Sequence, residues 1–299
     1  MTAVLVWGEL LWDRFSDGDR LGGAPANVAW HLAQLGTPVA LITRVGDDAD
    51  GRAAIAQLAA IGVDTSLVQV DPERATGEVT VTVEAGEPRY RLQPGRAWER
   101  IELTPAVAER LVTARALVYG TLAQRAPDGL ASLGAALAAA SPRVVRVCDP
   151  NLRPSSPAAG DDAALAQALA AADVVKLGER EVEQVRARLG HPDPVAWLLG
   201  RGARLVAVTR GAAGSTWYAP SPVSSAPFAV AAVAAAPGGD NVGCGDAFVA
   251  GLVHGLLAGW PWPRIGRLAA AIAAEVAAAR GATPVLDGPA LVARAEQPA

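Results

Sequence analysis

Residues 240–248 read Asp240-Asn241-Val242-Gly243-Cys244-Gly245-Asp246-Ala247-Phe248, with two glycines directly before an aspartate. An apolar stretch with a helical pattern follows and runs to about Gly259. Glycine reaches backbone angles closed to other residues, so successive N–H groups in this loop can converge on one point. The predicted helix adds its unpaired N-terminal N–H groups and the positive end of its dipole. The stretch therefore predicts a site for an anion such as phosphate.

Asp246 adds a carboxylate to this predicted anion site. The positive end of a helix favours the ionised, proton-accepting form of the carboxyl group. A base beside a phosphate cradle indicates phosphoryl transfer, in which the protein positions the reactants and accepts the proton of the attacking hydroxyl. The alternative is that Asp246 only caps its helix, which aspartate does well. The stretch alone leaves both interpretations open.

Composition limits the class of protein. The 299 residues are 51% apolar and 19% charged, which excludes a disordered or fibrous chain. The formal net charge of −4 gives no reason to expect nucleic acid as a partner. The sequence offers no charge-free run of the ~18 to 20 apolar residues that a membrane span needs, and its first residues lack the basic segment of a secretory signal. We therefore expect a cytoplasmic protein. The two cysteines agree with this expectation, because they are too few for a disulfide framework.

Lysine is almost missing from the chain, and Lys176 is the only one. The sequence therefore has no G-x-x-x-x-G-K-[S/T] loop of a P-loop nucleotidase and no V-A-I-K strand of a protein kinase. It also has no G-x-G-x-x-G after an early strand, which argues against a dinucleotide-dependent dehydrogenase.

Short apolar runs rich in β-branched residues alternate with helical patterns along the chain. They cover residues 4–6, 39–43, 116–119, 144–148, 174–177 and 205–209. Apolar strands spaced by helices predict an α/β fold with a mainly parallel sheet covered on both faces. Ligands bind beyond the carboxyl ends of such strands, so we expect the chemistry there.

Two segments break this pattern. Residues 11–22 hold a Ser16-Asp17-Gly18-Asp19 turn between short extended pieces. Within residues 77–101, valines alternate strictly with polar residues from 78 to 84, before a turn and a second extended piece. Alternation with period two predicts a small antiparallel sheet with one wet face, although an ordinary edge hairpin is the alternative.

The stretch quoted first resembles the D-T-x-G-A-G-D-A-F signature of the ribokinase-like (PfkB) carbohydrate kinase family. Asn241 stands in place of the usual Thr and Cys244 in place of Ala. The resemblance implies a three-layer sandwich with a mainly parallel central sheet, formed as a single domain by residues 1–299. It also implies that the small antiparallel sheet is a lid over the sugar and a candidate homodimer surface.

By the same resemblance, Asp246 is the base that deprotonates a sugar hydroxyl. The anion hole for the γ-phosphate of ATP is the backbone of Gly243, Cys244 and Gly245. Asp240 is the candidate neighbour of a monovalent cation such as K⁺.

Further motifs follow the family's order along the chain. Residues 21–29 resemble its G-G-x-x-x-N signature, and residues 149–154 resemble the D-x-N-x-R segment of its fructokinases. The resemblance, together with the position of one tryptophan in the predicted lid, places these residues at the sugar: Asp13, Gly23, Asn27, Trp98 and Arg153. Each residue also has a structural alternative. Asp13 could be a solvated loop residue, the glycines before Asn27 could simply lead into a helix, Trp98 could be a packing residue, and Arg153 could form a surface salt bridge.

The nucleotide side shows two more likenesses. Residues 176–181 resemble the K-x-N-x-x-E element, with Gly178 in place of the usual Asn or Ser, and by this resemblance Glu181 would organise Mg²⁺ through water. Residues 208–214 resemble the V-T-x-G-x-x-G loop that contacts ATP. The residues implied at the nucleotide are Lys176, Thr209, Gly211 and Gly214. Acidic residues in a first helical turn also simply complement the helix dipole.

The five motifs together predict an ATP-dependent sugar kinase that uses Mg²⁺, with D-fructose as the favoured substrate because the sugar motifs look most like those of fructokinases. The alternatives are a kinase for 2-keto-3-deoxygluconate, ribose or a nucleoside, or a sugar- or nucleotide-binding protein without turnover. The intact Asp246 argues against the last of these.

Overall fold

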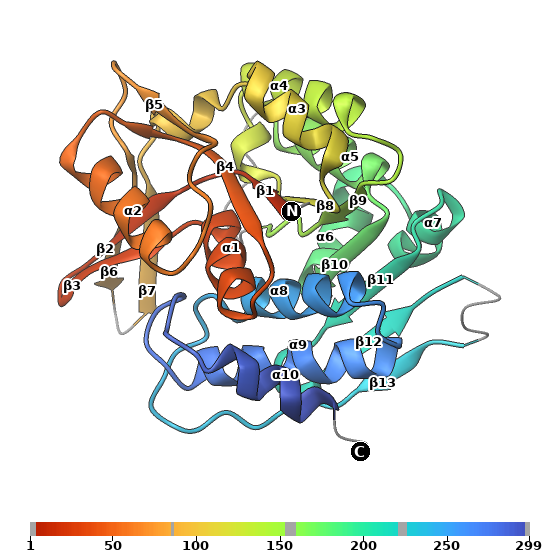
Figure 1. The fold of residues 1–299 in the computed structure, drawn as a ribbon. Helices are drawn as coiled ribbons and strands as arrows, with labels where there is room; N and C mark the ends of the chain where they lie inside the picture. Colours follow the sequence, from red (N-terminus) through yellow and green to blue (C-terminus); the bar gives the residue numbers. More distant parts are fainter. Residues whose placement is uncertain (1–3, 85–86, 153–159, 221–225, 297–299) are drawn as a thin grey trace.

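The computed structural model describes residues 4–84, 87–152, 160–220 and 226–296. Its main feature is a nine-stranded sheet with the order β13-β12-β11-β10-β9-β8-β1-β4-β5 (Figure 1). From β5 to β11 in this order the strands run parallel, and β12 and β13 add an antiparallel edge. The strands are β1 (Val4–Trp7), β4 (Val39–Gly46), β5 (Val68–Asp71), β8 (Ala116–Tyr119), β9 (Val145–Cys148), β10 (Val174–Gly178), β11 (Leu205–Thr209), β12 (Ser215–Tyr218) and β13 (Phe228–Val230).

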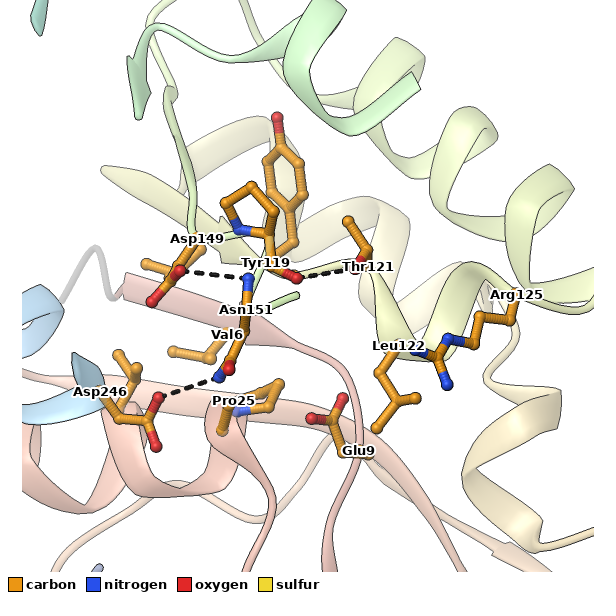
Figure 2. Close-up of a pocket in the computed structure, with 15 residues that line it drawn as sticks. Val6, Glu9, Pro25, Tyr119, Thr121, Leu122, Arg125, Asp149, Asn151 and Asp246 are labelled. Carbon is orange, nitrogen blue, oxygen red and sulfur yellow. Dashed lines mark hydrogen bonds between the residues drawn. The ribbon is translucent and has the colours of Figure 1, made fainter. Parts of the chain in front are cut away.

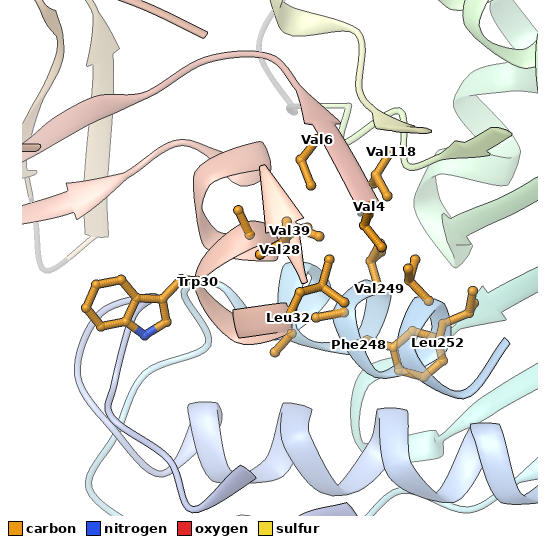
Figure 3. Close-up of a cluster of buried hydrophobic side chains, with 14 of the residues drawn as sticks. Val4, Val6, Val28, Trp30, Leu32, Val39, Val118, Phe248, Val249 and Leu252 are labelled. Carbon is orange, nitrogen blue, oxygen red and sulfur yellow. The ribbon is translucent and has the colours of Figure 1, made fainter. Parts of the chain in front are cut away.

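Helices cover both faces of this sheet, which explains why its strands are apolar on both sides. Val4 and Val6 of β1 pack into one core, while Leu5 and Trp7 point into the other. The first core, shown in Figure 3, lies under α1 (Ala24–Gln34), α2 (Ala49–Ala60), α8 (Cys244–Leu257), α9 (Trp262–Ala277) and α10 (Gly288–Glu296). The second lies under α3 (Pro105–Thr113), α4 (Pro127–Ala139), α5 (Asp161–Ala171), α6 (Glu179–Leu189) and α7 (Pro194–Gly200). The predicted three-layer α/β fold is confirmed.

The position of α8 is fixed by close packing on α9. A Cβ at Gly251 would lie 2.8 Å from the Cα of Ala269, and a Cβ at Gly255 would lie 2.9 Å from a side-chain carbon of Ile265. Because these glycines stand four residues apart, they form one bare stripe on α8. The two helices therefore approach each other closely and lie side by side in Figure 1.

A second, four-stranded sheet has the order β3-β2-β6-β7. Its strands are β2 (Leu11–Phe15), β3 (Gly18–Gly22), β6 (Gly77–Glu84) and β7 (Glu87–Leu92). Both hairpins, β2–β3 and β6–β7, are antiparallel as predicted. The central pair β2–β6 is parallel, because no hairpin joins these strands and the chain passes through β3, α1, β4, α2 and β5 between them. The predicted small sheet is thus confirmed, with one parallel pair at its centre.

One arginine ties the small sheet to the main body. Arg14 of β2 forms ion pairs with Asp19 of β3, Asp50 of α2 and Glu78 of β6. The indole Nε1 of Trp12 also donates to the backbone oxygen of Asp50 at 3.1 Å. The small sheet therefore sits against the start of α2. Among the helices that the structure describes, none has the length and apolar character needed to cross a lipid bilayer.

Candidate active site

The carboxyl ends of β1, β8 and β9 meet the start of α8 around one cavity (Figure 2). Glu9 follows β1, Thr121 follows β8, and Asp149 and Asn151 follow β9. Asp246 reaches the same cavity from the first turn of α8. Polar side chains from four elements therefore converge where the parallel sheet predicts a ligand.

Asp246 is held by two amide side chains. Its carboxyl Oδ2 accepts a hydrogen bond from Asn27 Nδ2 at 2.8 Å, and Oδ1 accepts one from Asn151 Nδ2 at 3.3 Å. Asp246 is only 6% exposed and Asn27 only 5%. The structure thus brings together Asn27 and Asp246, which the sequence assigned to the sugar and to proton transfer. An amide NH₂ group can only donate, so both carboxylate oxygens are oriented as acceptors.

Asn151 adopts an unusual backbone conformation. Its φ is 50°, and it is the one non-glycine residue with positive φ in the described part of the chain. Its backbone N–H donates to Asp149 Oδ1 at 3.2 Å, which stabilises the bend after β9. Left-handed backbone costs ~1 to 2 kcal/mol for most residues other than glycine, and asparagine is one of the few that adopt it. Such strain clusters at functional sites, and here it aims the Asn151 amide at Asp246.

Lys176 lies behind this bend in a buried ion network. Its Nζ lies 3.2 Å from Asp149 Oδ2 and 3.8 Å from Glu181 Oε2. Burial raises the pKa of Asp149 to about 7, with the carboxylates of Glu181 and Asp246 adding to the rise and the Lys176 ammonium opposing it. Burial alone would lower the pKa of Lys176, but the carboxylates outweigh it and raise that pKa above its usual value. Lys176 therefore stays charged.

Glu181 joins the network at the first turn of α6. Its Oε2 accepts the backbone N–H of Gly178 at 2.5 Å, and its Oε1 accepts that of Leu152 at 2.7 Å. A Cβ at Gly178 would lie 3.2 Å from Oε2, so this position suits glycine. Glu181 thus connects the ends of β9 and β10. Its contact with Mg²⁺ through water stays a prediction.

The predicted anion loop begins with a glycine in a left-handed backbone conformation. Gly243 caps α8 with a φ of 80°, and a Cβ there would lie 2.5 Å from the Cβ of Ala282. A Cβ at Gly245 would lie 3.1 Å from Lys176 Nζ. Burial raises the pKa of the intervening Cys244 thiol to about 11, with nearby carboxylates adding to the rise, so the thiol stays protonated. Backbone N–H groups, dipole and one ammonium therefore favour an anion here.

Asp240 fixes the chain on both sides of this loop. Its Oδ1 accepts the N–H of Val242 at 3.0 Å, and its Oδ2 accepts that of Gly281 at 3.0 Å. Its own N–H donates to the carbonyl oxygen of Ala279 at 2.9 Å. Asp240 therefore joins the anion loop to the segment that follows α9, and its predicted role beside a cation is untested.

Three side chains of α1 hold the same segment from the other side. His31 Nε2 donates to the Ala282 carbonyl oxygen at 2.9 Å, and Trp30 Nε1 donates to that of Pro284 at 3.1 Å. Gln34 accepts the N–H of Leu286 at 2.6 Å. Burial lowers the pKa of His31 to about 4, so its ring is neutral at physiological pH. The helix α1, which carries Asn27, thus also holds in place the segment around Ala282, against which Gly243 packs.

The predicted nucleotide residues lie at the ends of β10 and β11. Thr209 pairs with Gly178 in the sheet, and its hydroxyl donates to the Leu177 carbonyl oxygen at 3.4 Å. Gly211 and Gly214 have φ values of 55° and 83° in the following turn. This turn therefore lies on the same strand ends as Lys176.

Three of the remaining sugar candidates, Asp13, Gly23 and Trp98, lie in or near the small sheet. Asp13 lies in β2, and Gly23 caps α1 with a φ of 102°. A Cβ at Gly23 would lie 2.4 Å from the backbone oxygen of Glu9, so the approach is close. Trp98 is 3% exposed and packs on Gly77, so its predicted sugar contact stays a prediction. Arg153 lies outside the described residues.

The polar residues of the site that received no role from the sequence include Glu9, Asp149 and Asn151. All three were visible at predicted strand ends, and the D-P-N stretch was noted only for Arg153. The rule that ligands gather at strand ends was the signal that could have found them.

Comparisons with known proteins point to one family. The model of the pfkB family carbohydrate kinases matches residues 13–287. A fructokinase of Klebsiella pneumoniae is 34% identical over 268 residues, which are 85% of this chain and 84% of that protein. A 5-dehydro-2-deoxygluconokinase of Geobacillus thermodenitrificans is 29% identical, over 89% of this chain and 82% of that protein.

Among solved structures, the fructokinase of Vibrio cholerae O395 in its fructose-, ADP- and calcium-bound form superposes with a TM-score of 0.80. It is 27% identical, and the match covers 99% of each chain. The family match spans most of the sequence, and the fold is that of kinases in this family. The chain belongs to the pfkB family of carbohydrate kinases.

Proposed function

We propose that the protein transfers the γ-phosphoryl group of ATP to a hydroxyl of D-fructose. The observation that carries the proposal is the placement of Asp246, with both carboxylate oxygens oriented by amides, in the first turn of a helix capped by Gly243. This arrangement puts a proton acceptor beside an anion cradle. The names of a relative and of a solved neighbour, both fructokinases, support fructose as the sugar.

In the proposed reaction, a sugar hydroxyl donates its proton to Asp246 while its oxygen attacks the γ-phosphorus. The bond from that phosphorus to the β–γ bridging oxygen breaks, and ADP leaves with the electron pair. The N–H groups around Gly243 and Gly245 would stabilise the charge on the transferring group. The protein's part is therefore positioning and electrostatics.

The residues present fit Mg²⁺ as an ion carried by the phosphates and by water. Within the described residues, no cluster of three or more His, Cys, Asp or Glu side chains could hold a metal by itself. Mg²⁺ commonly keeps several waters and binds with substrate phosphates. We propose that Glu181 contacts its water shell and that Asp240 lies beside a K⁺ ion. When bound, Mg²⁺ neutralises phosphate charge.

We also propose that the small sheet acts as a lid and as a homodimer surface. Asp13 of β2 would reach the sugar when the lid is closed, which would exclude water from the reaction. Static light scattering measures the oligomeric state. A monomer at micromolar concentration would contradict the dimer proposal and leave the kinase proposal intact.

An ADP-release assay over a panel of sugars and nucleosides tests the main proposal. We expect turnover with ATP and D-fructose well above the sugar-free rate. Preference for ribose, a nucleoside or 2-keto-3-deoxygluconate would contradict fructose while leaving a kinase. A correctly folded protein that binds sugar without releasing ADP with any acceptor would contradict the catalytic proposal.

A further inference from the structure

The β2–β3 hairpin of the small sheet has two different faces. In its register Asp13 pairs with Arg20, and Arg14 pairs with Asp19. Paired residues of an antiparallel hairpin share a face, and successive residues alternate between faces. Asp13 and Arg20 therefore lie on one face, while Arg14 and Asp19 lie on the other, where Arg14 is tied to Asp50 of α2. The aspartate expected to contact the sugar is thus the direct neighbour of an arginine.

Arg20 reaches from this face to the segment that follows α9. A Cβ at Gly281 would lie 2.8 Å from the Cδ of Arg20, so the aliphatic stem of the arginine packs on the buried backbone of Gly281. The guanidinium beyond the stem is held by Asp17, which lies 2.7 Å away, and by the ring of Phe15, whose centroid lies 4.3 Å from Cζ. The stem is therefore fixed at both ends and covers Gly281 as an apolar group.

Gly281 and Ala282 connect the hairpin to the anion loop. The N–H of Gly281 donates to Asp240 Oδ2 at 3.0 Å, and Asp240 Oδ1 accepts the N–H of Val242 inside the loop at 3.0 Å. Ala282 packs on Gly243, where an added Cβ would lie only 2.5 Å from the Ala282 Cβ. Protein interiors are close-packed, so a shift of this segment must be passed on to the loop.

The two ends of this path carry the two expected substrates. Asp13 is expected to contact the sugar, and the N–H groups around Gly243 are expected to bind the γ-phosphate of ATP. A sugar bound by Asp13 would restrict the hairpin and keep Arg20 packed on Gly281, because a ligand favours the conformation that it binds best. By linkage, ATP bound at the loop would favour the sugar to the same extent.

We infer that Arg20 is a positioning residue that couples sugar binding at the β2–β3 hairpin to ATP binding at the anion loop, so that each substrate strengthens binding of the other. The inference rests on the proposed kinase function and adds a coupling to it. Arg20 acts through Gly281 and not on the reacting atoms. ATP would then bind tightly chiefly when a sugar is in place, which limits its hydrolysis by water.

Calorimetry measures this coupling as the Kd of β,γ-methylene-ATP with Mg²⁺, with and without a saturating sugar. The sugar is the one preferred in the ADP-release panel, expected to be D-fructose. The proteins are the wild type, Arg20→Ala, Arg20→Met and Arg186→Ala. Arg186 is the matched control, because it also pairs with an acid three positions earlier, Glu183, but lies in the last turn of α6.

We expect the sugar to lower this Kd at least ~5-fold in the wild type and in Arg186→Ala, but less than ~2-fold in Arg20→Ala. Arg20→Met should keep most of the effect, because methionine retains an unbranched apolar stem over Gly281.

Two further measurements separate coupling from a purely structural role. In the steady state, Arg20→Ala should raise the KM for ATP at saturating sugar at least ~3-fold and leave kcat within a few-fold, since the change affects binding and not chemistry. Hydrogen–deuterium exchange of residues 279–283 should slow when sugar alone is added to the wild type. In Arg20→Ala the same addition should have little effect.

Several results would overturn the inference. If the sugar leaves the Kd of the ATP analogue unchanged in the wild type, the coupling does not exist, while the kinase function stands on ADP release; this result needs no variant to fold. If Arg20→Ala keeps the full effect, another contact carries the coupling. If Arg20→Met loses it as completely as Arg20→Ala, packing on Gly281 is not the link. If no sugar is phosphorylated, the proposed function falls and the inference falls with it.

Discussion

The amide of Asn27 donates to the carboxylate of Asp246 at 2.8 Å and joins residues 219 positions apart in the chain. It connects the first turns of α1 and α8, each of which follows a glycine with positive φ. The hydrogen bond therefore couples α1, the helix expected to contact the sugar, to α8, the helix expected to supply the base. Changes on either helix should be felt by Asp246.

Replacement of Asp246 by Asn should lower kcat by at least ~10² to 10⁴, the usual contribution of a positioned general base. The side chain keeps its shape, so sugar affinity measured by calorimetry should change modestly. Steady-state ADP release supplies kcat. If a folded Asp246→Asn protein turns over at a near-normal rate, Asp246 is only a helix cap.

Gly243→Ala should lower stability and ATP binding by more than the cost of placing alanine at a positive φ. Gly36 offers a matched control, because its φ of 74° is close to the 80° of Gly243 but nothing lies within 4 Å of a Cβ there. Both variants pay the left-handed penalty of ~1 to 2 kcal/mol. Only Gly243→Ala must also push Ala282 away. Denaturant unfolding and the KM for ATP measure the two effects. Equal losses in both variants would show that the contact with Ala282 is unimportant.

Two variants of Asn151, Asn151→Gly and Asn151→Ala, distinguish the effect of its backbone conformation from the effect of its side-chain amide. Both variants lose the amide that donates to Asp246, but glycine adopts φ 50° freely, whereas alanine tolerates this backbone angle less well than asparagine and adds strain. A hydrogen bond to a charged group is worth ~1.5 to 3 kcal/mol, so kcat should fall about tenfold or more in both variants. The melting temperature should fall only in the alanine variant. Full activity in Asn151→Gly would contradict a role for the amide.

Lys176→Met should destabilise the fold, because it leaves the carboxylates of Asp149 and Glu181 close together in a buried site. Removing one member of a buried ion pair costs ~3 to 5 kcal/mol. The double variant Asp149→Asn with Lys176→Met should recover part of that loss, which urea unfolding would measure. Additive losses would show that the two residues are not coupled.

His31 should make stability depend on pH. Its pKa is lowered from 6.5 to about 4 by burial, so the unfolded state binds the proton more readily than the folded state. Stability should therefore fall as the pH drops from about 6.5 to about 4 and level off below, by ~3 kcal/mol in all. His31→Gln should flatten this part of the curve relative to the wild type. An unchanged pH profile in His31→Gln would exclude His31 as the cause.

The sequence was informative where structure is local. Continuous apolar runs predict the parallel strands because both faces of each strand are buried, and the two glycines before Asp246 predict the anion loop because their geometry needs no distant partner. The β2–β3 and β6–β7 hairpins were predictable from turns and alternation. The parallel β2–β6 contact was not, since local pattern does not say which hairpins become neighbours.

The buried ion network depends on register, which the sequence does not reveal. Val175 pairs with Cys148, so the residues after them, Lys176 and Asp149, come side by side at the ends of β10 and β9. The left-handed backbone of Asn151 likewise depends on contacts made with Asp149 and Asp246 after folding. No sequence motif pointed to Glu9, because its position at the cavity depends on segments that come together only in the folded chain.

The parallel β2–β6 pair also sets an order of events during synthesis. A nascent chain that has left the ribosome only as far as β5 already contains the β2–β3 hairpin, yet the inner edge of β2 has no strand to bond until β6 emerges. An unpaired edge of this kind can bind to foreign strands. Chains truncated before Gly77 should therefore be the form of this protein most prone to aggregate and most dependent on chaperones.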